Sequence, residues 1–262
     1  MRSVSNCTIS MGLVSVPIKV YTANSANRIS FNRLSPDGNR LKQQYVDTIT
    51  GKVVDTKTCT DKGYEYAKGK YVKFTADELS KLDAAASSDI DIKHFVPLEE
   101  IESLRVEKSY LLGTNGGEKS YSLLSKVMED KWVAAIGIWK SRGRDHLVAI
   151  EPVRENGMRG LAMQQLFYQD EHNSITEVGV SGCDASDAEL ELAGKLVETM
   201  TESEMKWSDY KNEYVERVQN MVEAKISGKD VNLLPQQPNP QIIDLFEALK
   251  QSLVDGQQKN LN

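Results

Sequence analysis

The residues with the clearest chemical potential are cations that flank a glycine in the stretch WKSRGRDHL, residues 139–147. An alternating apolar run enters this stretch and another leaves it, which is typical of two strands joined by a hairpin. The cations are Lys140, Arg142 and Arg144. Strands hold such side chains at fixed spacing, and their N–H donors match phosphate oxygens in geometry and charge. The hairpin therefore predicts a phosphate-binding surface.

A second group of cations recurs between residues 28 and 57, where two turn sequences, Pro36–Asn39 and Thr50–Gly51, interrupt strand-like runs. Proline fixes φ and glycine supplies a positive φ, so we predict a long hairpin system. Its cations are Arg28, Arg33, Arg40, Lys42, Lys52 and Lys57, and Lys19 lies on a strand before them. The sequence shows no recognition helix or zinc finger, so the expected contacts are with phosphates rather than with base edges.

The charge of the chain is distributed unevenly. The 262 residues carry a net charge of −6, yet residues 1–75 have 12 Lys and Arg against 5 Asp and Glu. Residues 131–160 are also basic, whereas residues 161–262 have 8 basic against 18 acidic side chains. This asymmetry predicts a polyanion-binding half and an acidic appendage, because the local field attracts a ligand and the total charge does not.

Other kinds of chemistry find little support. The three cysteines, Cys7, Cys59 and Cys183, are far apart, and no two histidines stand at metal-ligand spacing. Asp145 and His146 are adjacent on a strand and should point to opposite faces, which disfavours an acid–base pair. We therefore expect no metal and no cofactor, and no catalytic pair at Asp145 and His146.

The expected location is the cytoplasm. No stretch approaches the roughly 18 apolar residues of a membrane span, so no membrane partner is expected. The first six residues also lack the apolar run of a signal peptide.

The elements that must position these cations read as many strands and few helices, which favours a β-barrel or sandwich core. The expected strands are Cys7–Val14 with its continuation Val16–Tyr21, Ile29–Leu34, Leu41–Val46, Lys52–Thr56, Tyr71–Thr75, Ile90–Val96, Val106–Leu112, Trp132–Trp139 and Leu147–Val153. A capping-box pattern at Thr75–Glu78 predicts a short helix, and Gly117–Met128 predicts another. Tyr64, Tyr66 and Tyr71 have two interpretations, either stacking on bases or packing in the core or on the barrel surface.

The last third of the chain changes to helical periodicity. We expect a helix from Asp184–Ser186 to about Met200, and a second from Ser208–Asp209 to about Ile226. Their apolar stripes predict packing faces. A proline-rich linker follows, and a final amphipathic helix at Ile242–Leu253 is the best candidate for docking on a partner or a second copy. The partner-binding residues we expect on it are Ile242, Leu245, Phe246 and Leu249.

The order of several segments resembles one protein family. Ile9–Tyr21 is similar to the opening of the prokaryotic Ku proteins. Further similar segments follow in the family's order: Ile29–Phe31, Lys62–Tyr66, Gly117–Tyr121, Arg142–Leu147, and the helices around Tyr210–Lys229 and Ile242–Leu253. The resemblance covers nearly the whole chain.

The resemblance implies a fold and a function. It implies a mainly β protein with an α-helical appendage, whose β-barrel core carries a strand bridge and C-terminal helices and forms a homodimeric ring around duplex DNA. It also implies binding of double-stranded DNA ends in non-homologous end joining, recruitment of an ATP-dependent DNA ligase, no enzymatic activity, and association with the nucleoid. Residues 28–57 would supply much of the bridge, with Arg142 and Arg144 facing the ring's interior.

The same resemblance suggests domain limits: a core over residues 1–180 with bridge strands at about 28–66, a helical region over 184–228, a linker over 229–240, and a terminal helix and tail over 241–262. Two departures matter. Many relatives have a Cys-x-x-Cys-Gly turn where this chain has Asp47–Gly51, and a lysine-rich tail where this chain has Gln257–Asn262. Metal binding at that turn and tail functions are therefore not expected.

Two other hypotheses fit the residues alone. One is a general polyanion- or RNA-binding barrel protein that forms no ring. The other is a small-molecule-binding or catalytic barrel that uses Asp145, His146 and the basic cleft.

Overall fold

The computed structural model describes residues 1–26, 28–59, 61–83, 89–141, 143–180, 182 and 185–228. The chain divides into two compact units. The first holds Met1–Ala26 and Ser30–Asn173, and the second holds the residues from Ser174 onward together with residues 27–29. Each unit is described by itself.

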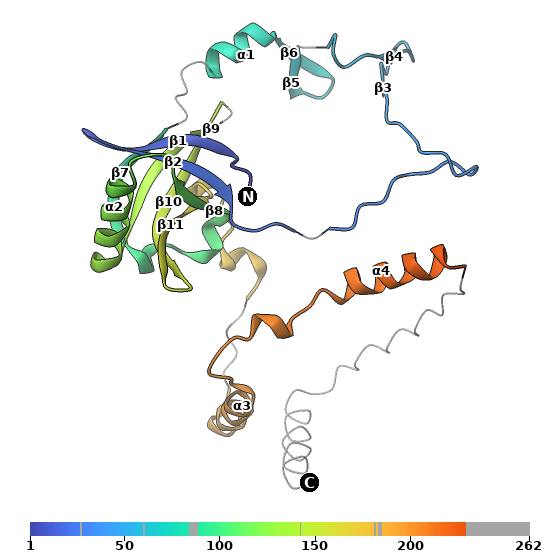
Figure 1. Ribbon diagram of the computed structural model, residues 1–262. Coiled ribbons are helices and arrows are strands. Elements are labelled where there is room, and N and C mark those ends of the chain that lie inside the picture. Colours follow the sequence, from blue (N-terminus) through green and yellow to red (C-terminus); the bar gives the residue numbers. More distant parts are fainter. Residues whose placement is uncertain are drawn as a thin grey trace. The chain divides into compact units, whose positions relative to one another are not determined.

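The first unit contains a closed barrel of seven strands (Figure 1). Neighbouring strands follow the order β1-β2-β8-β11-β10-β9-β7. Their bounds are β1 Ser5–Met11, β2 Val14–Thr22, β7 Ile90–Pro97, β8 Val106–Thr114, β9 Val133–Ser141, β10 Arg144–Glu155 and β11 Met158–Leu166. The expected β-barrel core is confirmed, and so are the expected strands at β7, β8, β9 and β10.

The barrel closes at a short seam between its first strand and β7. These two strands are parallel and pair only through Ile9 with Ile90 and Ser10 with Asp91. All the other pairings in the barrel are antiparallel. The seam joins strands that are separated in sequence by residues 12–89, a stretch that includes β2.

The core fills the barrel with side chains from alternate positions of each strand. On β2, Val16, Ile18 and Val20 are buried, whereas Pro17 and Lys19 between them are partly exposed. The same alternation buries Val148 and Ile150 on β10. Period-two burial of β-branched residues is the expected pattern for strands with one face inward.

The helix α2, Glu118–Lys131, packs against β9, β10 and β11 and contributes to the core through Tyr121 and Met128 (Figure 1). The Tyr121 hydroxyl donates to the carbonyl of Leu112 at 2.5 Å and accepts from the N–H of Leu161 at 2.8 Å. The helix expected over Gly117–Met128 is confirmed and continues to Lys131.

Between β2 and β7 the chain leaves the barrel in a segment that we call the excursion, residues 28–74. It contains two hairpins, β3 Tyr45–Val46 with β4 Val53–Val54, and β5 Lys62–Ala67 with β6 Lys70–Phe74. No described residue of the excursion is buried. The helix α1, Ala76–Asp83, follows, and Thr75 with Glu78 forms the expected capping box through bonds of 2.8 and 3.3 Å.

The second unit contains helices α3, Asp187–Met200, and α4, Glu213–Ile226. The side chain of Ser186 caps α3 in a capping box with Glu189, as its sequence indicates. Short 3-10 helices of the second unit lie at Ile175–Val178 and Trp207–Asp209, and those of the first unit lie at Leu98–Glu100, Ser103–Arg105 and Gln169–Glu171. The apolar stripes of α3 and α4 are largely exposed, and Val215 alone is buried among the described residues of these two helices.

Several sequence expectations were wrong. Cys7–Val14 is not one strand: Gly12, with φ 57°, and Leu13 form a two-residue turn that joins β1 to β2. Ile29–Leu34 forms no strand and has only a single bridge from Leu34 to Arg40. The helix expected from Ser208 begins at Glu213, because the Asn212 side chain, and not Asp209, accepts from the helix N-terminus.

Two further strands are shorter than expected, and two, β5 and β11, were not among the expected strands. Only Tyr45–Val46 and Val53–Val54 pair within the predicted runs Leu41–Val46 and Lys52–Thr56. The strand β11 was missed, although the turn before it, Asn156–Gly157, has positive φ at both positions (49° and 79°), as a type I′ hairpin requires.

Candidate nucleic-acid interface

The first basic cluster is held by a tight turn in the excursion. The N–H of Gly38 donates to Ser35 at 2.9 Å, and Gly38 has φ 82°. On the arms of this turn, the N–H of Leu41 donates to the carbonyl of Arg33 at 2.9 Å, and Arg40 bridges Leu34. The backbone therefore holds Arg33 and Arg40 on opposite arms of one turn.

The next turn, between β3 and β4, is organised by one carboxylate. Asp47 accepts from the N–H groups of Thr50 at 2.9 Å and Ile49 at 2.8 Å, and these bonds hold the pKa of its carboxyl below the ordinary value. The N–H of Asp47 also donates to the carbonyl of Lys52 at 2.9 Å. The Asp47 carboxylate is thus hydrogen-bonded within the turn, while the Lys52 side chain is exposed.

The expected site cations of the excursion have no described carboxylate partner, whereas Lys73 further along pairs with Asp61. Six expected site residues are exposed and lack an ion pair within 4.0 Å to any described carboxylate: Arg28, Arg33, Arg40, Lys42, Lys52 and Lys57. An unpaired surface cation keeps its full charge for an incoming ligand, and it loses no protein partner when that ligand binds.

The second basic cluster lies on the hairpin between β9 and β10. In the strand register, Lys140 of β9 lies opposite Asp145 of β10, and Ser141 lies opposite Arg144. Trp139, beside Lys140, is only 3% exposed and faces the core, so Lys140 projects from the outer surface. Arg144 is exposed at the tip, where Gly143 has φ 72°. Arg142 lies outside the described residues.

The barrel does not bring Lys19 to this hairpin. Lys19 projects outward from β2, opposite Gly113 of β8 and Asn6 of β1. In the closed order, β2 is three strands away from β9 in one direction and three away from β10 in the other. Lys19 therefore lies on the far side of the barrel from Lys140 and Arg144.

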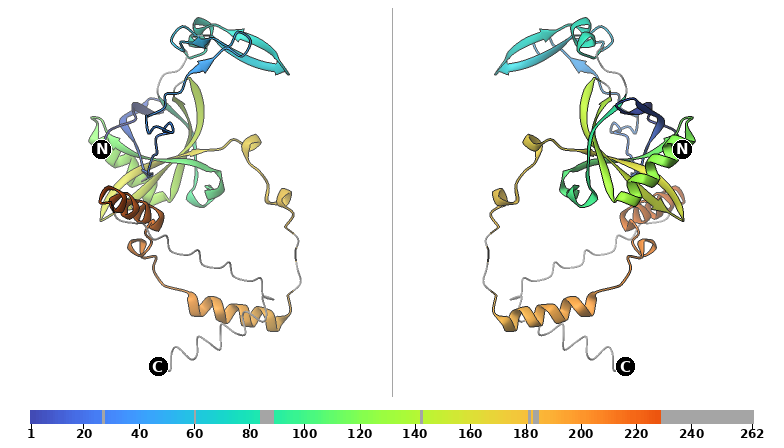
Figure 2. Two further views of the ribbon diagram at one scale, coloured as in Figure 1. Left: turned by 90° about the vertical axis from the view of Figure 1, so that its right-hand side faces the viewer. Right: turned by 90° about the vertical axis from the view of Figure 1, so that its left-hand side faces the viewer.

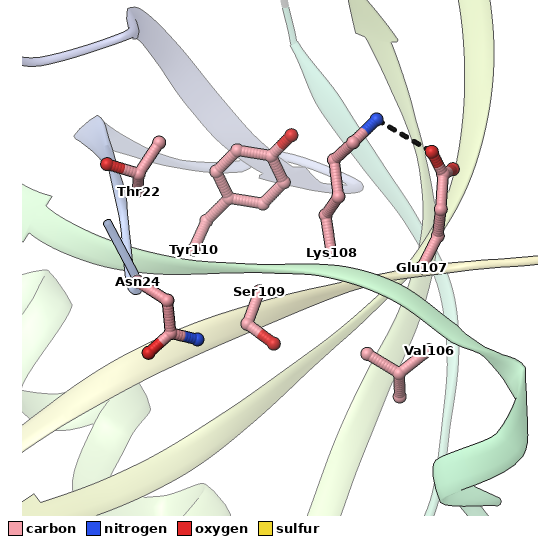
Figure 3. A pocket seen from close by; sticks show the side chains of 7 residues that line it. All are labelled: Thr22, Asn24, Val106, Glu107, Lys108, Ser109 and Tyr110. Carbon is pink, nitrogen blue, oxygen red and sulfur yellow. Dashed lines mark hydrogen bonds and ion pairs between the residues drawn. The ribbon is translucent and has the colours of Figure 1, made fainter. Parts of the chain in front are cut away.

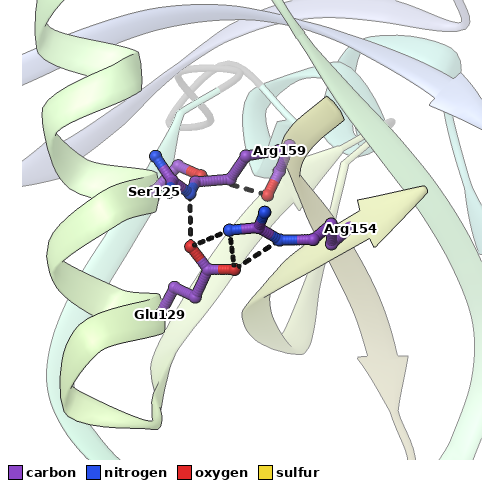
Figure 4. Close-up of polar contacts among 5 residues, drawn as sticks. Ser125, Glu129, Arg154 and Arg159 are labelled. Atoms are coloured by element: carbon purple, nitrogen blue, oxygen red, sulfur yellow. Dashed lines mark hydrogen bonds and ion pairs between the residues drawn. The ribbon is translucent and has the colours of Figure 1, made fainter. Parts of the chain in front are cut away.

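Two arginines of the barrel that the sequence did not single out are already neutralised (Figure 4). Arg154 and Arg159 face each other across β10 and β11, and Glu129 of α2 accepts from both. Arg154 donates two bonds, at 3.0 and 3.1 Å, and both guanidinium groups hold the pKa of the Glu129 carboxyl below its ordinary value. These cations fasten a helix to a hairpin and offer little to a ligand.

The alternative site around Asp145 and His146 is not assembled. The Asp145 side chain is exposed, whereas His146 turns toward the barrel interior, with its ring centroid 5.7 Å from that of Trp139. The Nδ1 atom of His146 lies 3.1 Å from Nε2 of Gln165. The two neighbours therefore point apart, as the strand geometry predicts.

A pocket of about 450 Å³ lies beside the first residues of β8 (Figure 3). Its residues are Thr22, Asn24, Val106, Glu107, Lys108, Ser109 and Tyr110. Glu107 and Lys108 pair with each other at 2.6 Å across its rim. Neither Asp145 nor His146 lines it, so the pocket does not support the small-molecule hypothesis built on those residues.

Among the described residues there is no group of three or more His, Cys, Asp or Glu side chains that could hold a metal ion. Within the same part of the chain, no helix is both long and apolar enough to cross a membrane. The expected partner-binding residues Ile242, Leu245, Phe246 and Leu249 lie outside the described residues.

Comparison with known proteins supplies a family. Residues 10–192 match the model of the Ku70/Ku80 beta-barrel domain. The chain belongs to the Ku family. A relative from Paraburkholderia phymatum named "Non-homologous end joining protein Ku" is 36% identical over 97% of this chain and 83% of its own length. Relatives of the same name from Archaeoglobus fulgidus and Lachnoclostridium phytofermentans are 35% and 34% identical, over 97% and 95% of this chain and 98% and 95% of their own lengths.

The Ku match contains both basic clusters. It begins within β1 and ends within α3, so the excursion and the hairpin between β9 and β10 both fall inside it. The resemblance drawn from the ordered sequence segments is confirmed.

One basic element was missed by the sequence reasoning. The hairpin of β5 and β6 carries Lys62, Lys68 and Lys70 beside its three tyrosines. The signal was present in the run KGYEYAKGKYVK, residues 62–73, where lysines and tyrosines alternate around a Lys68–Gly69 turn. These tyrosines lie neither in the core nor on the barrel surface.

Proposed function

We propose that this chain binds the ends of double-stranded DNA in non-homologous end joining, without regard to sequence. The observation that carries the proposal is a Ku-family barrel with unpaired, exposed cations on its excursion and on one hairpin. Relatives at 34–36% identity are named as non-homologous end joining proteins. The binding groups are the excursion cations together with Lys140, Arg142 and Arg144, which contact phosphates.

The proposed assembly is a homodimeric ring that a duplex threads from its end. Isolated two-stranded hairpins are marginally stable in water, and the excursion has two of them with no buried residue. A second copy that packs against the hairpin of β3 and β4 would supply the contacts that this hairpin lacks. A closed ring then selects ends by topology, because it can be entered only where the duplex stops.

The charge pattern supports such a ring. Only the inner wall needs positive charge, and the acidic remainder of the chain discourages binding through the wrong surface. Phosphate binding releases counterions from DNA, so affinity should fall steeply with salt.

A mobility-shift titration tests the proposal. One labelled duplex is compared with the same sequence closed covalently into a circle, each at about 50 and 200 mM salt. We expect binding to the linear form alone, with a loss of affinity of about a thousandfold between the two salt concentrations if six or more phosphates are contacted. Equal binding to the circle would contradict threading and would favour a general polyanion binder.

The proposed role is recruitment rather than catalysis. The final helix would dock an ATP-dependent DNA ligase through Ile242, Leu245, Phe246 and Leu249, in the cytoplasm and on the nucleoid when DNA is bound. Deletion of residues 241–262 should reduce ligase capture by the DNA-bound protein, measured by pull-down, with dimer mass by light scattering as the control. Unchanged capture and unchanged mass would remove the helix from the proposal.

A further inference from the structure

The hairpin of β5 and β6 is an unusual surface because it is aromatic and exposed throughout. Tyr64, Tyr66 and Tyr71 are 67%, 61% and 62% exposed. β5 and β6 pair as an antiparallel hairpin, drawn in cyan in Figure 2. Every residue of both strands is exposed except Phe74, which is partly so. These exposed tyrosine rings therefore do not serve to pack a hydrophobic core within the hairpin.

The two faces of the hairpin differ. Tyr64 pairs with Val72 across the strands and shares its face, while Tyr71 pairs with Glu65 on the other face. The Tyr71 ring covers Gly63, where a β-carbon would come 3.3 Å from its Cδ1 atom. Tyr66 lies at the irregularity between Glu65 and Ala67. Tyr71 is thus engaged by the hairpin, whereas the rings of Tyr64 and Tyr66 remain open.

The carboxylates of the hairpin are already used. Glu65 Oε1 accepts from the N–H of Gly69 at 2.7 Å and closes the turn. Asp61 pairs with Lys73 at 2.6 Å. The other three cations, Lys62, Lys68 and Lys70, are exposed and have no ion pair to a described residue. The surface around the open rings is therefore positively charged.

We propose that this hairpin binds the unpaired bases of a single-stranded overhang at the DNA end. Open aromatic rings beside lysines are the combination by which proteins hold single strands, with bases stacked on the rings and phosphates on the cations. A blunt duplex hides its base faces in the stack, so only unpaired nucleotides fit. The uncompensated lysines favour this polyanion over the surface of a second copy.

The inference rests on the proposed function, since an end-binding protein is what brings an overhang to the hairpin. The experiment measures affinity for a blunt duplex and for the same duplex with a 3′ thymidine overhang. We expect the wild-type protein to prefer the overhang. In Tyr64→Ala with Tyr66→Ala, affinity for the overhang duplex should fall about fivefold or more, while affinity for the blunt duplex stays unchanged.

Two control variants sharpen the test. Tyr64→Phe with Tyr66→Phe keeps both rings and should retain the preference. Tyr210→Ala removes an exposed tyrosine from the second unit and should also leave the preference intact. Stacking is read directly from quenching of 2-aminopurine placed in the overhang, which the alanine variant should lose.

The outcomes separate this proposal from the function it rests on. Failure of the wild-type protein to bind blunt duplex would contradict the proposed function, and 2-aminopurine quenching in a free single strand would still test the hairpin. An overhang preference that survives the double alanine variant would overturn the hairpin proposal. The proposal would also be overturned if the Tyr64→Ala, Tyr66→Ala variant had the mass of a monomer in light scattering. The open face would then belong to a contact between two copies of the protein.

Discussion

The barrel and the excursion belong to one chain but differ in how they bury apolar side chains and pair charged ones. In the barrel, apolar side chains fill the interior, and Arg154 and Arg159 share the carboxylate of Glu129. In the excursion, no described residue is buried, and the cations on both sides of the Ser35–Gly38 turn have no described carboxylate partner.

The difference teaches where stability and binding reside. The barrel has a core of its own, and its buried polar side chains are largely hydrogen-bonded within it, with Trp139 Nε1 as an exception. In the excursion, Asp47 and Glu65 accept bonds that close turns and Asp61 pairs with Lys73, while most of the cations have no described carboxylate partner. Under the proposed function, such a segment would gain its contacts from DNA or a second copy, so substitutions in the two regions should change different measured quantities.

The largest expected effect compares one isoleucine in each region. Ile150 in the core is 1% exposed, whereas Ile49 at the hairpin tip is 94% exposed. Ile150→Ala should lower the free energy of unfolding by about 2–5 kcal/mol, because it leaves a cavity. Ile49→Ala should change it by less than about 0.5 kcal/mol. Urea unfolding followed by tryptophan fluorescence measures both, and equal losses would abolish the contrast.

An intermediate effect concerns cations alone. Arg33→Gln with Arg40→Gln should leave the urea midpoint unchanged and weaken duplex binding. The plot of log affinity against log salt should become shallower by about 1.8, since two phosphate contacts are lost. Lys93→Gln is the matched control, because Lys93 is an exposed lysine of the barrel that already pairs with Asp91. A slope that changes equally in the control would show that net charge, and not these positions, sets the affinity.

The smallest effect is a pH dependence within the barrel. Arg154 and Arg159 lower the pKa of Glu129 from its ordinary value of 4.5. The carboxylate therefore adds stability above pH 4.5, and this contribution is lost as the pH falls through the lower pKa of the folded state. The urea midpoint of the wild-type protein should drop more steeply than that of Glu129→Gln between about pH 5 and pH 3. Parallel curves for the two proteins would mean that the ion cluster contributes nothing measurable.

The sequence predicted local structure well where short-range chemistry decides it. The capping box expected at Thr75 is formed by side chains three residues apart, so pattern and structure coincide. The run Ile90–Val96 also became a strand. By contrast, the run Cys7–Val14 alternates like a single strand, whereas Gly12, with its positive φ, and Leu13 form a turn between two strands.

The sequence could not show which cations meet. Lys19 and Lys140 are both strand cations, and strand order alone places them on opposite sides of the barrel. Whether a cation is free also depends on distant acids. Arg154 and Arg159 look as available in sequence as Arg144 does, and only the packing of α2 brings Glu129 to them.

The narrow seam between β1 and β7 has a consequence for folding. Pairing Ile9 with Ile90 closes a loop that contains the entire excursion. The entropy of closing a flexible loop rises only logarithmically, by about 0.6 kcal/mol for each doubling of its length. Variants with longer or shorter excursions should thus close their barrels at similar cost, and the reach of the excursion can be changed almost independently of barrel stability.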